Sequence, residues 1–335
     1  CRCTEDQLRK EVLPFGYWFR PLIVTMIGNK FQLDIATGRL TLPVVILLSF
    51  FLWIISAQSW AELGSLAIVA ATGYLMIEMN TAFSLIRTRT AFPVCIYWYS
   101  IASLFFLHPF DWTQFVPLLF ILATYLLFNS YESSSAPAWI YHSFLFIGIA
   151  SLAFPQIIYF TPIFLISTIS FRSLSAKGLL ASLLGLATPY WFLLGHAFYH
   201  DEMHLFYAPF QELCHFYPIS YQAIPHHVLF SWGFITCLLL VTSLHYLMVS
   251  YQDKTRTRIY LSFMVAISIW TAIFIALQPQ HITTLLPVQL IGTSFLAAHL
   301  FTLTRNRFSN IFFVVIILIY ITLTSYNLWM LFFNS

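Results

Sequence analysis

The sequence predicts an all-α protein, a polytopic transmembrane helical bundle with about 11 spans. Of its 335 residues, 60% are apolar and only 8% are charged, and the mean hydropathy is +0.81. Soluble globular chains lack this composition, so lipid is expected to be the solvent for most of the surface. The apolar runs hold about 16 to 24 residues, which suits helices rather than the roughly 10-residue strands of a barrel. Helices also satisfy their own backbone hydrogen bonds, as lipid requires.

Charged and Pro/Gly-rich breaks divide the apolar runs into the expected spans. In chain order these spans are 42–58, 63–86, 91–107, 114–129, 138–154, 156–171, 178–198, 228–250, 259–277, 282–303 and 310–333. The division around Pro155 leaves almost no linker and requires a tight hairpin. The longest loop, 199–227, is too short to bury a core, so residues 42–333 are expected to form one transmembrane domain.

Residues 1–41 are expected to form an N-terminal segment on the cytoplasmic side. Residues 1–25 match no cleavable signal, and the segment M-I-G-N-K-F that begins at Met26 resembles a natural start followed directly by the first span. A misplaced start codon upstream of Met26 is one explanation of residues 1–25.

Every basic residue falls on one side of this topology. With eleven spans, the N-terminus and the loops after spans 2, 6, 8 and 10 hold all the Lys and Arg, at positions 2, 9, 10, 20, 30, 39, 87, 89, 172, 177, 254, 256, 258, 305 and 307. The positive-inside rule then predicts a cytoplasmic N-terminus and a periplasmic C-terminus. The basic residues are dispersed among short loops, so no nucleic-acid partner is expected.

Acidic and histidine residues gather on the predicted outer side. The acids there that would be candidates for catalysis are Glu62, Asp111, Asp201 and Glu202. A carboxylate at the membrane surface can serve as a general base or assist a metal ion.

The outer end of the span 178–198 suggests a metal site. If the helix continues past that end, His196, His200 and His204 repeat every four residues and share one face beside Asp201. Imidazoles at this spacing can hold a transition metal. The pattern lacks the Glu of the protease motif H-E-x-x-H. The alternative is that these residues decorate a helix end at headgroup level, followed by aromatic residues that lie on the bilayer surface.

Polar residues inside or beside the spans are candidates for binding. They are Glu78, Asn80, Arg87, Arg89 and Gln289. An ionisable group inside a membrane is costly and usually faces other helices or a water-filled cavity, so Glu78 is expected to do so. The alternative is a protonated Glu78 that hydrogen-bonds a neighbouring helix. Considered singly, His245, Gln289 and His299 are better explained as packing residues.

Three segments carry a resemblance to a known group of proteins. They are I-R-T-R-T-A-F-P at 86–93, F-R-S-L-S at 171–175 and L-L-G-L-A-T-P-Y at 183–190. With the short-looped helices between residues 80 and 195, they resemble an uncharacterised family of multi-pass membrane proteins of Bacteroidota. The resemblance implies a bacterial inner membrane and brings no activity with it. The outer acids also loosely resemble those of transferases and polymerases that use polyprenyl-linked sugars, but the paired acidic motif after the first span is absent.

The expected function is therefore cell-envelope biogenesis or transport of a small or lipid-linked substrate. A polyprenyl-linked sugar transferase or polymerase is the alternative, and a structural or assembly partner in a membrane complex is the second alternative. Membrane lipids are expected partners and a lipid-linked substrate is a candidate partner. The sequence leaves the cofactors and the protein partners unknown, and it leaves open whether the chain is an enzyme.

Overall fold

The computed structural model describes residues 31–57 and 59–333, and this part of the chain is all-α, as predicted. The expectations about residues 1–30, including the start at Met26, lie outside the described residues. The α-helices are α3 (Phe31–Thr37), α4 (Thr41–Ser56), α5 (Ala61–Phe83), α6 (Phe92–Ser103), α7 (Phe115–Asn129), α8 (Ala136–Ala153), α9 (Thr161–Ser170), α10 (Ala176–Tyr199), α11 (Met203–Cys214), α12 (His226–Val249), α13 (Thr255–Leu277), α14 (Ile282–Leu303) and α15 (Arg307–Phe333). Short 3-10 turns are η1 (Phe105–Leu107), η2 (Trp112–Gln114), η3 (Pro155–Phe160), η4 (Ser250–Gln252) and η5 (Pro279–His281).

The described helices make the chain a multi-pass membrane protein. Eight of them are long and apolar enough to span a bilayer, or nine if α3 and α4, bent by 79°, count as one span. The predicted count of about 11 is not confirmed, because two predicted spans are short. Helix α6 has 12 residues, and the apolar helix Pro155–Ser170 also falls below the 18 residues of the others. Twelve helical residues extend only about 18 Å, against a hydrocarbon core of about 30 Å.

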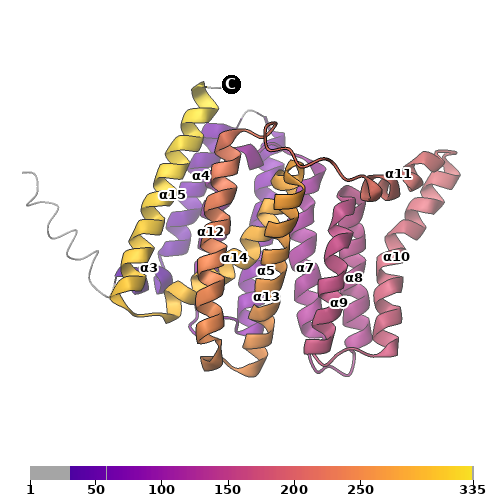
Figure 1. Ribbon diagram of the computed structural model, residues 1–335, viewed down its shortest axis with the longest axis horizontal. Coiled ribbons are helices and arrows are strands. Elements are labelled where there is room, and N and C mark those ends of the chain that lie inside the picture. The colour runs from indigo at the N-terminus through magenta and orange to yellow at the C-terminus, as the bar shows by residue number, and fades with distance from the viewer. Residues whose placement is uncertain (1–30, 58, 334–335) are drawn as a thin grey trace, which may run out of the picture.

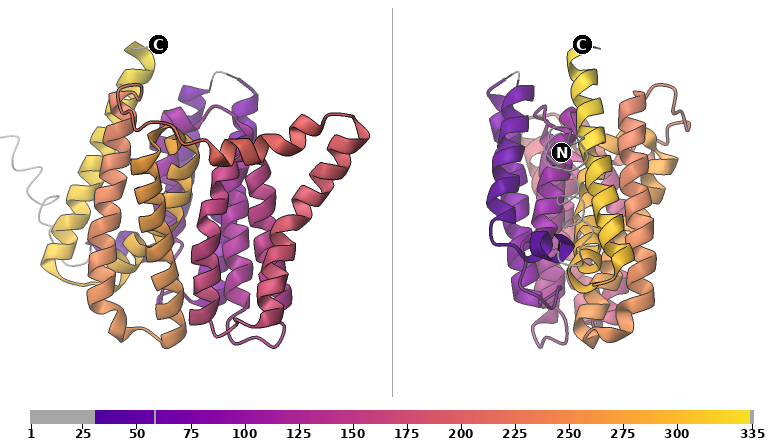
Figure 2. Two further views of the ribbon diagram at one scale, coloured as in Figure 1. Left: turned by 45° about the vertical axis from the view of Figure 1, so that its right-hand side comes forward. Right: turned by 90° about the vertical axis from the view of Figure 1, so that its left-hand side faces the viewer.

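The helices stand side by side in a bundle that is wide in one direction and narrow in the other (Figures 1 and 2). Helix α15 lies at one edge and α10 at the other. Helix α14 lies inside, with 19 of its 22 residues buried. Small residues permit its close contact with α13: a Cβ on Gly292 would lie 3.1 Å from the Met264 carbonyl oxygen and 1.9 Å from the Ser268 Oγ.

The loops that carry the basic residues meet at one end of the bundle, which we call the basic end. It holds the α5–α6, α9–α10, α12–α13 and α14–α15 connections, at the lower side of Figure 1. The α6–α7, α8–α9 and α13–α14 connections lie at the opposite end, together with α11 and the C-terminal end of α15. The structure thus gathers the predicted basic loops at one end, where the acidic residues Glu132 and Asp253 also lie, paired with Arg172 and Arg87.

The loop expected at 199–227 contains a helix. Helix α10 ends at Tyr199, and Asp201 takes a left-handed conformation with φ of 56° that turns the chain. Helix α11 follows and runs across the opposite end back toward the bundle (Figure 2). No residue of α11 is buried. That this segment lies on the bilayer surface stays a prediction.

Candidate functional site

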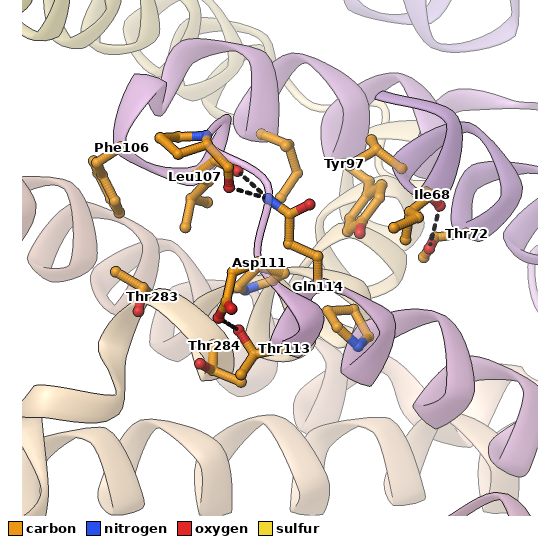
Figure 3. Close-up of a pocket in the computed structure, with 15 residues that line it drawn as sticks. Ile68, Thr72, Tyr97, Phe106, Leu107, Asp111, Thr113, Gln114, Thr283 and Thr284 are labelled. Carbon is orange, nitrogen blue, oxygen red and sulfur yellow. Dashed lines mark hydrogen bonds between the residues drawn. The ribbon is translucent and has the colours of Figure 1, made fainter. Parts of the chain in front are cut away.

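A cavity of about 210 Å³ enters the bundle from the opposite end, between α5, α6, α7 and α14 (Figure 3). The exposed residues Pro109, Asp111 and Thr283 stand among its lining, so the cavity reaches the surface there. Fully buried Tyr97 and buried Thr72 line it more deeply. Its polar lining consists of Thr72, Tyr97, Asp111, Thr113, Gln114, Thr283 and Thr284.

The start of α7 positions two of these side chains. Asp111 caps η2: its Oδ1 accepts from the Trp112 backbone N–H at 2.8 Å, and its Oδ2 accepts from the Thr113 hydroxyl. The Gln114 Nε2 donates to the carbonyl oxygens of Leu107 and Pro109, at 3.0 and 2.6 Å. The Gln114 Oε1 is buried and has no hydrogen-bond partner among the described residues. The cavity therefore offers a carboxylate and an amide oxygen, both of which accept hydrogen bonds.

Beside this cavity, α4, α5 and the α6–α7 loop meet around His108. The Ser56 Oγ lies 2.5 Å from the His108 Nδ1, and the Nε2 lies 3.3 Å from the Ile101 carbonyl oxygen. Burial lowers the pKa of His108 to about 4, so the ring is neutral at physiological pH. Glu62, a predicted catalytic acid, is buried in the first turn of α5 and does not line the cavity; its backbone oxygen accepts from the Trp53 Nε1 at 3.0 Å.

A second polar cluster lies at the basic end, around Asp253. The Asp253 Oδ2 is 2.8 Å from the His299 Nε2, and both side chains are only 1% exposed. The Asp253 Oδ1 is 3.3 Å from the Arg87 Nε, and the Arg87 side chain is 46% exposed. Arg87 was predicted as a binding residue. His299, considered singly, was expected only to pack, and the structure gives it a charged partner.

The predicted binding residues Glu78, Asn80, Arg87, Arg89 and Gln289 do not form one site. The expectation that Glu78 faces other helices is wrong, because α5 buries the face that carries Thr72, Met76 and Met79 and leaves Glu78 exposed. Asn80 has a structural contact: its Nδ2 donates to the Thr90 carbonyl oxygen at 2.9 Å, and its Oδ1 accepts from the Ile86 N–H at 3.2 Å.

Arg89 is exposed in the α5–α6 connection. Gln289 is fully buried in α14, whereas the other predicted binding residues lie on α5 and in the α5–α6 connection. Its Nε2 donates to the Thr236 Oγ1 at 3.1 Å, while its Oε1 has no partner among the described residues. These positions leave Gln289 as a polar contact between α12 and α14.

The predicted metal ligands do not share one helix face. The rings of His196 and His200 lie 4.5 Å apart, but α10 ends at Tyr199, so the expected continuous helix through His204 is wrong. Among residues 31–57 and 59–333, no group of three or more His, Cys, Asp or Glu side chains is placed to hold a metal ion. Asp201 and Glu202 are exposed in the turn before α11, so of the four predicted catalytic acids only Asp111 lines the cavity.

An apolar groove of about 320 Å³ lies between α3, α4, α6, α14 and α15. Its lining includes Phe92, Phe301 and Phe313, with few polar atoms. A groove of this composition within the apolar part of the bundle fits a hydrocarbon chain.

Sequence reasoning missed Asp253 and the pairing of His299 with it. Asp253 lies next to Lys254 in a short basic loop, where a solvated surface charge is the ordinary interpretation. The two residues are separated by 46 positions. The available signal was a histidine inside an apolar span, since such a group needs a partner.

Comparison with models of protein families, with curated proteins and with solved structures finds no match. The helices show a polytopic integral membrane protein, and the cavity and the two polar clusters are its candidate sites.

Proposed function

We propose that this protein is a carrier for a small solute that donates hydrogen bonds, and that the solute binds in the cavity beside Asp111. The observation that supports this most directly is the contrast between the two ends along α14. The cavity enters beside Thr284 at one end, whereas the paired side chains of His299 and Asp253 at the other end are buried. A carrier alternates between such one-sided states around a site inside the membrane.

The size and chemistry of the cavity support a small substrate. Its volume of about 210 Å³ is below the roughly 300 Å³ at which sites for drug-sized ligands begin. Asp111 is the charged side chain of the lining, and the Gln114 Oε1 is an acceptor without a donor. A neutral or cationic solute with hydroxyl or amine groups would satisfy both.

The proposal includes a location. We place the protein in a bacterial inner membrane, as the resemblance of residues 80–195 implies, and its basic end in the cytoplasm, because of the one-sided distribution of Lys and Arg. The cavity would then face the periplasm.

The test is solute binding by the purified full chain, followed by uptake into vesicles. A panel of small amines, amino acids and polyols is screened for an increase in melting temperature, and each hit is offered as a radiolabelled solute. Gln114→Leu and Thr284→Val should weaken binding at least tenfold. Asp201→Asn and Glu202→Gln serve as controls, because both residues lie in the exposed turn and Asn tolerates the left-handed conformation of residue 201.

The carrier is supported if vesicles with the parent protein accumulate a solute that binds, and vesicles with the cavity variants do not. Failure of every class in the panel to bind or to accumulate would count against it. An envelope phenotype that follows Asp201 or Glu202 and ignores the cavity would favour the enzyme alternative.

A lipid-linked substrate is a second candidate, favoured by the apolar groove between α6, α14 and α15. Binding of a lipid-linked substrate would depend on residues of the apolar groove rather than on residues of the cavity. Bulky replacement of Ala297 in the groove, as Ala297→Phe, should then abolish binding of a lipid-linked probe while the cavity variants do not.

A further inference from the structure

Three elements that are distant in sequence meet around one buried carboxylate at the basic end. Asp253 lies between α12 and α13, Arg87 between α5 and α6, and His299 on α14. The two oxygens of Asp253 face different partners, His299 at 2.8 Å and Arg87 at 3.3 Å. The carboxylate of Asp253 thus joins the α5–α6 and α12–α13 connections to the central helix α14.

His299 has one ring nitrogen that can accept a further proton. Because its Nε2–H donates to Asp253, the Nδ1 of the neutral ring is an acceptor. This Nδ1 is buried and has no hydrogen-bond partner among the described residues. The Tyr246 ring packs edge-on at 5.4 Å, but its hydroxyl donates to the Arg258 carbonyl oxygen at 2.9 Å. Buried polar atoms in proteins usually have a hydrogen-bond partner, so the free Nδ1 of His299 is open to a proton or a water molecule.

We propose that His299 and Asp253 form a proton-binding site that controls the opening of the basic end. While the ring is neutral, the Asp253 carboxylate pairs with Arg87 and holds the α5–α6 turn against the α12–α13 turn. A proton taken from water onto the His299 Nδ1 produces an imidazolium, which competes with Arg87 for the carboxylate. Arg87 is half-exposed and can move into water at little cost.

This proposal rests on the proposed carrier function, since a carrier that loads at the opposite end must open its basic end to release the solute. The proton would then travel with the solute or set the direction of transport. Proton binding itself, however, can be measured without any solute, so the two proposals can fail separately.

Apart from Asp253 and half-exposed Arg87, the Asp, Lys and Arg side chains near His299 are exposed. A second histidine, His245 on α12, lies near His299, and its Nε2 is 3.1 Å from the Thr304 Oγ1. Among the described residues, Asp253 is the ion-pair partner of His299. The elements packed on α14 also carry Asp34, Cys95, Tyr97, Tyr99, Tyr125, His226, His227, Cys237, Tyr246, Tyr260, His281, Tyr320 and Tyr326. The neighbouring turns carry the exposed cations Arg89, Lys254, Arg256, Arg258, Arg305 and Arg307.

The experiment measures access to the basic end as a function of pH. Thr302 lies one helical turn after His299 and is buried, so Thr302→Cys places a thiol beside the site. The five natural cysteines are replaced, and the full chain is reconstituted in lipid nanodiscs. A water-soluble thiol reagent is the probe, and each rate is divided by that of the unfolded protein at the same pH. The normalised rate should rise at least tenfold between about pH 8 and about pH 5, where histidine titrates.

Three variants separate proton binding from general loosening. His299→Gln should remove the pH dependence, and Arg87→Gln should give fast labelling at both pH values because the ion pair is absent. The control is His142→Gln on α8, which is exposed and should retain the response of the parent protein. If His299→Gln does not fold, the parent profile and Arg87→Gln still decide.

Equal labelling of the parent protein at the two pH values would overturn the proposal, and so would an unchanged pH response in His299→Gln or slow labelling of Arg87→Gln at about pH 8. A flat pH response in a protein that still accumulates solute rejects the proton site alone. A pH response in a protein that carries no solute supports the proton site and rejects the carrier.

Discussion

The indole ring of Trp53 stacks on the imidazole ring of His108, with centroids 3.7 Å apart and planes within 13°. The contact joins the end of α4 to the α6–α7 loop, and the Trp53 Nε1 also donates to the backbone of α5. This loop continues directly into Pro109 and Asp111, which line the cavity. The stack therefore fixes the loop that shapes the cavity entrance.

His108 should make the folded protein sensitive to mild acid. Burial lowers the pKa of His108 from 6.5 to about 4, so between these values the unfolded chain binds a proton that the folded chain does not. Stability from this residue is complete above about pH 6.5 and falls as the pH decreases toward about 4, by up to roughly 3 kcal/mol. Thermal unfolding in detergent at a series of pH values measures it.

Two variants assign this pH dependence. His108→Gln should lower stability at neutral pH, because the stack and the Ser56 contact are altered, and should flatten the decline between pH 6.5 and 4. His142→Gln should keep the decline, since His142 is exposed on α8. The same decline in His108→Gln would assign the effect to another group.

Gly292 tests the close contact of α13 with α14. A Cβ at this position would lie 1.9 Å from the Ser268 Oγ and 3.1 Å from the Met264 carbonyl oxygen, so one of the two helices must shift. Gly292→Ala should destabilise the fold by about 1 to 3 kcal/mol. Gly195→Ala on α10 is the matched control, because a Cβ there meets nothing within 4 Å. That control should be neutral or stabilising by up to about 1 kcal/mol, and equal melting temperatures for the two variants would contradict the packing.

The sequence was sufficient to predict an all-α membrane protein and to place its basic loops together at one end. It could not predict which face of each helix is buried, because helices such as α5 are apolar on all sides and show no clear amphipathic stripe. Glu78 was assigned to the interior because an ionisable group inside a membrane is costly, and no stripe on α5 indicated the opposite face. The predicted number of spans is not confirmed, because hydropathy detects an apolar run such as α6 without showing that it bridges the bilayer.

The candidate site was predictable only in part. Asp111 was found because outer acids are unusual in an apolar chain, whereas the acceptor role of Gln114 depends on how its amide is held by two carbonyl groups. Asp253 was missed because its burial arises from tertiary contact with His299. Such pairings depend on which helices are neighbours, and a single sequence does not give that information.

Asn80 and Glu78 are close in sequence but should respond in opposite ways to substitution. Asn80→Ala removes both hydrogen bonds to the α5–α6 connection and leaves the buried Ile86 N–H without its acceptor, at a cost of about 1 to 3 kcal/mol. Glu78 has no hydrogen bond or ion pair with the described residues, so Glu78→Gln should leave folding unchanged. Protein abundance and melting temperature in detergent compare the two. A Glu78→Gln variant that loses stability in the membrane but not in detergent would reveal a partner in the bilayer.

The orientation of the bundle can be tested with reporters that are active in only one compartment. Because all Lys and Arg of the predicted loops fall on one side, the basic end should be cytoplasmic. Fusions after Lys177 and Arg258 should show cytoplasmic activity, and fusions after Cys214 and Ser335 should show periplasmic activity. The fusion after Ser335 also tests the number of spans. If only this fusion showed cytoplasmic activity, the chain would have one more or one fewer span than the alternation of basic loops allows. Outer activity after both Lys177 and Arg258 would reverse the bundle and place the cavity beside Asp111 on the cytoplasmic side.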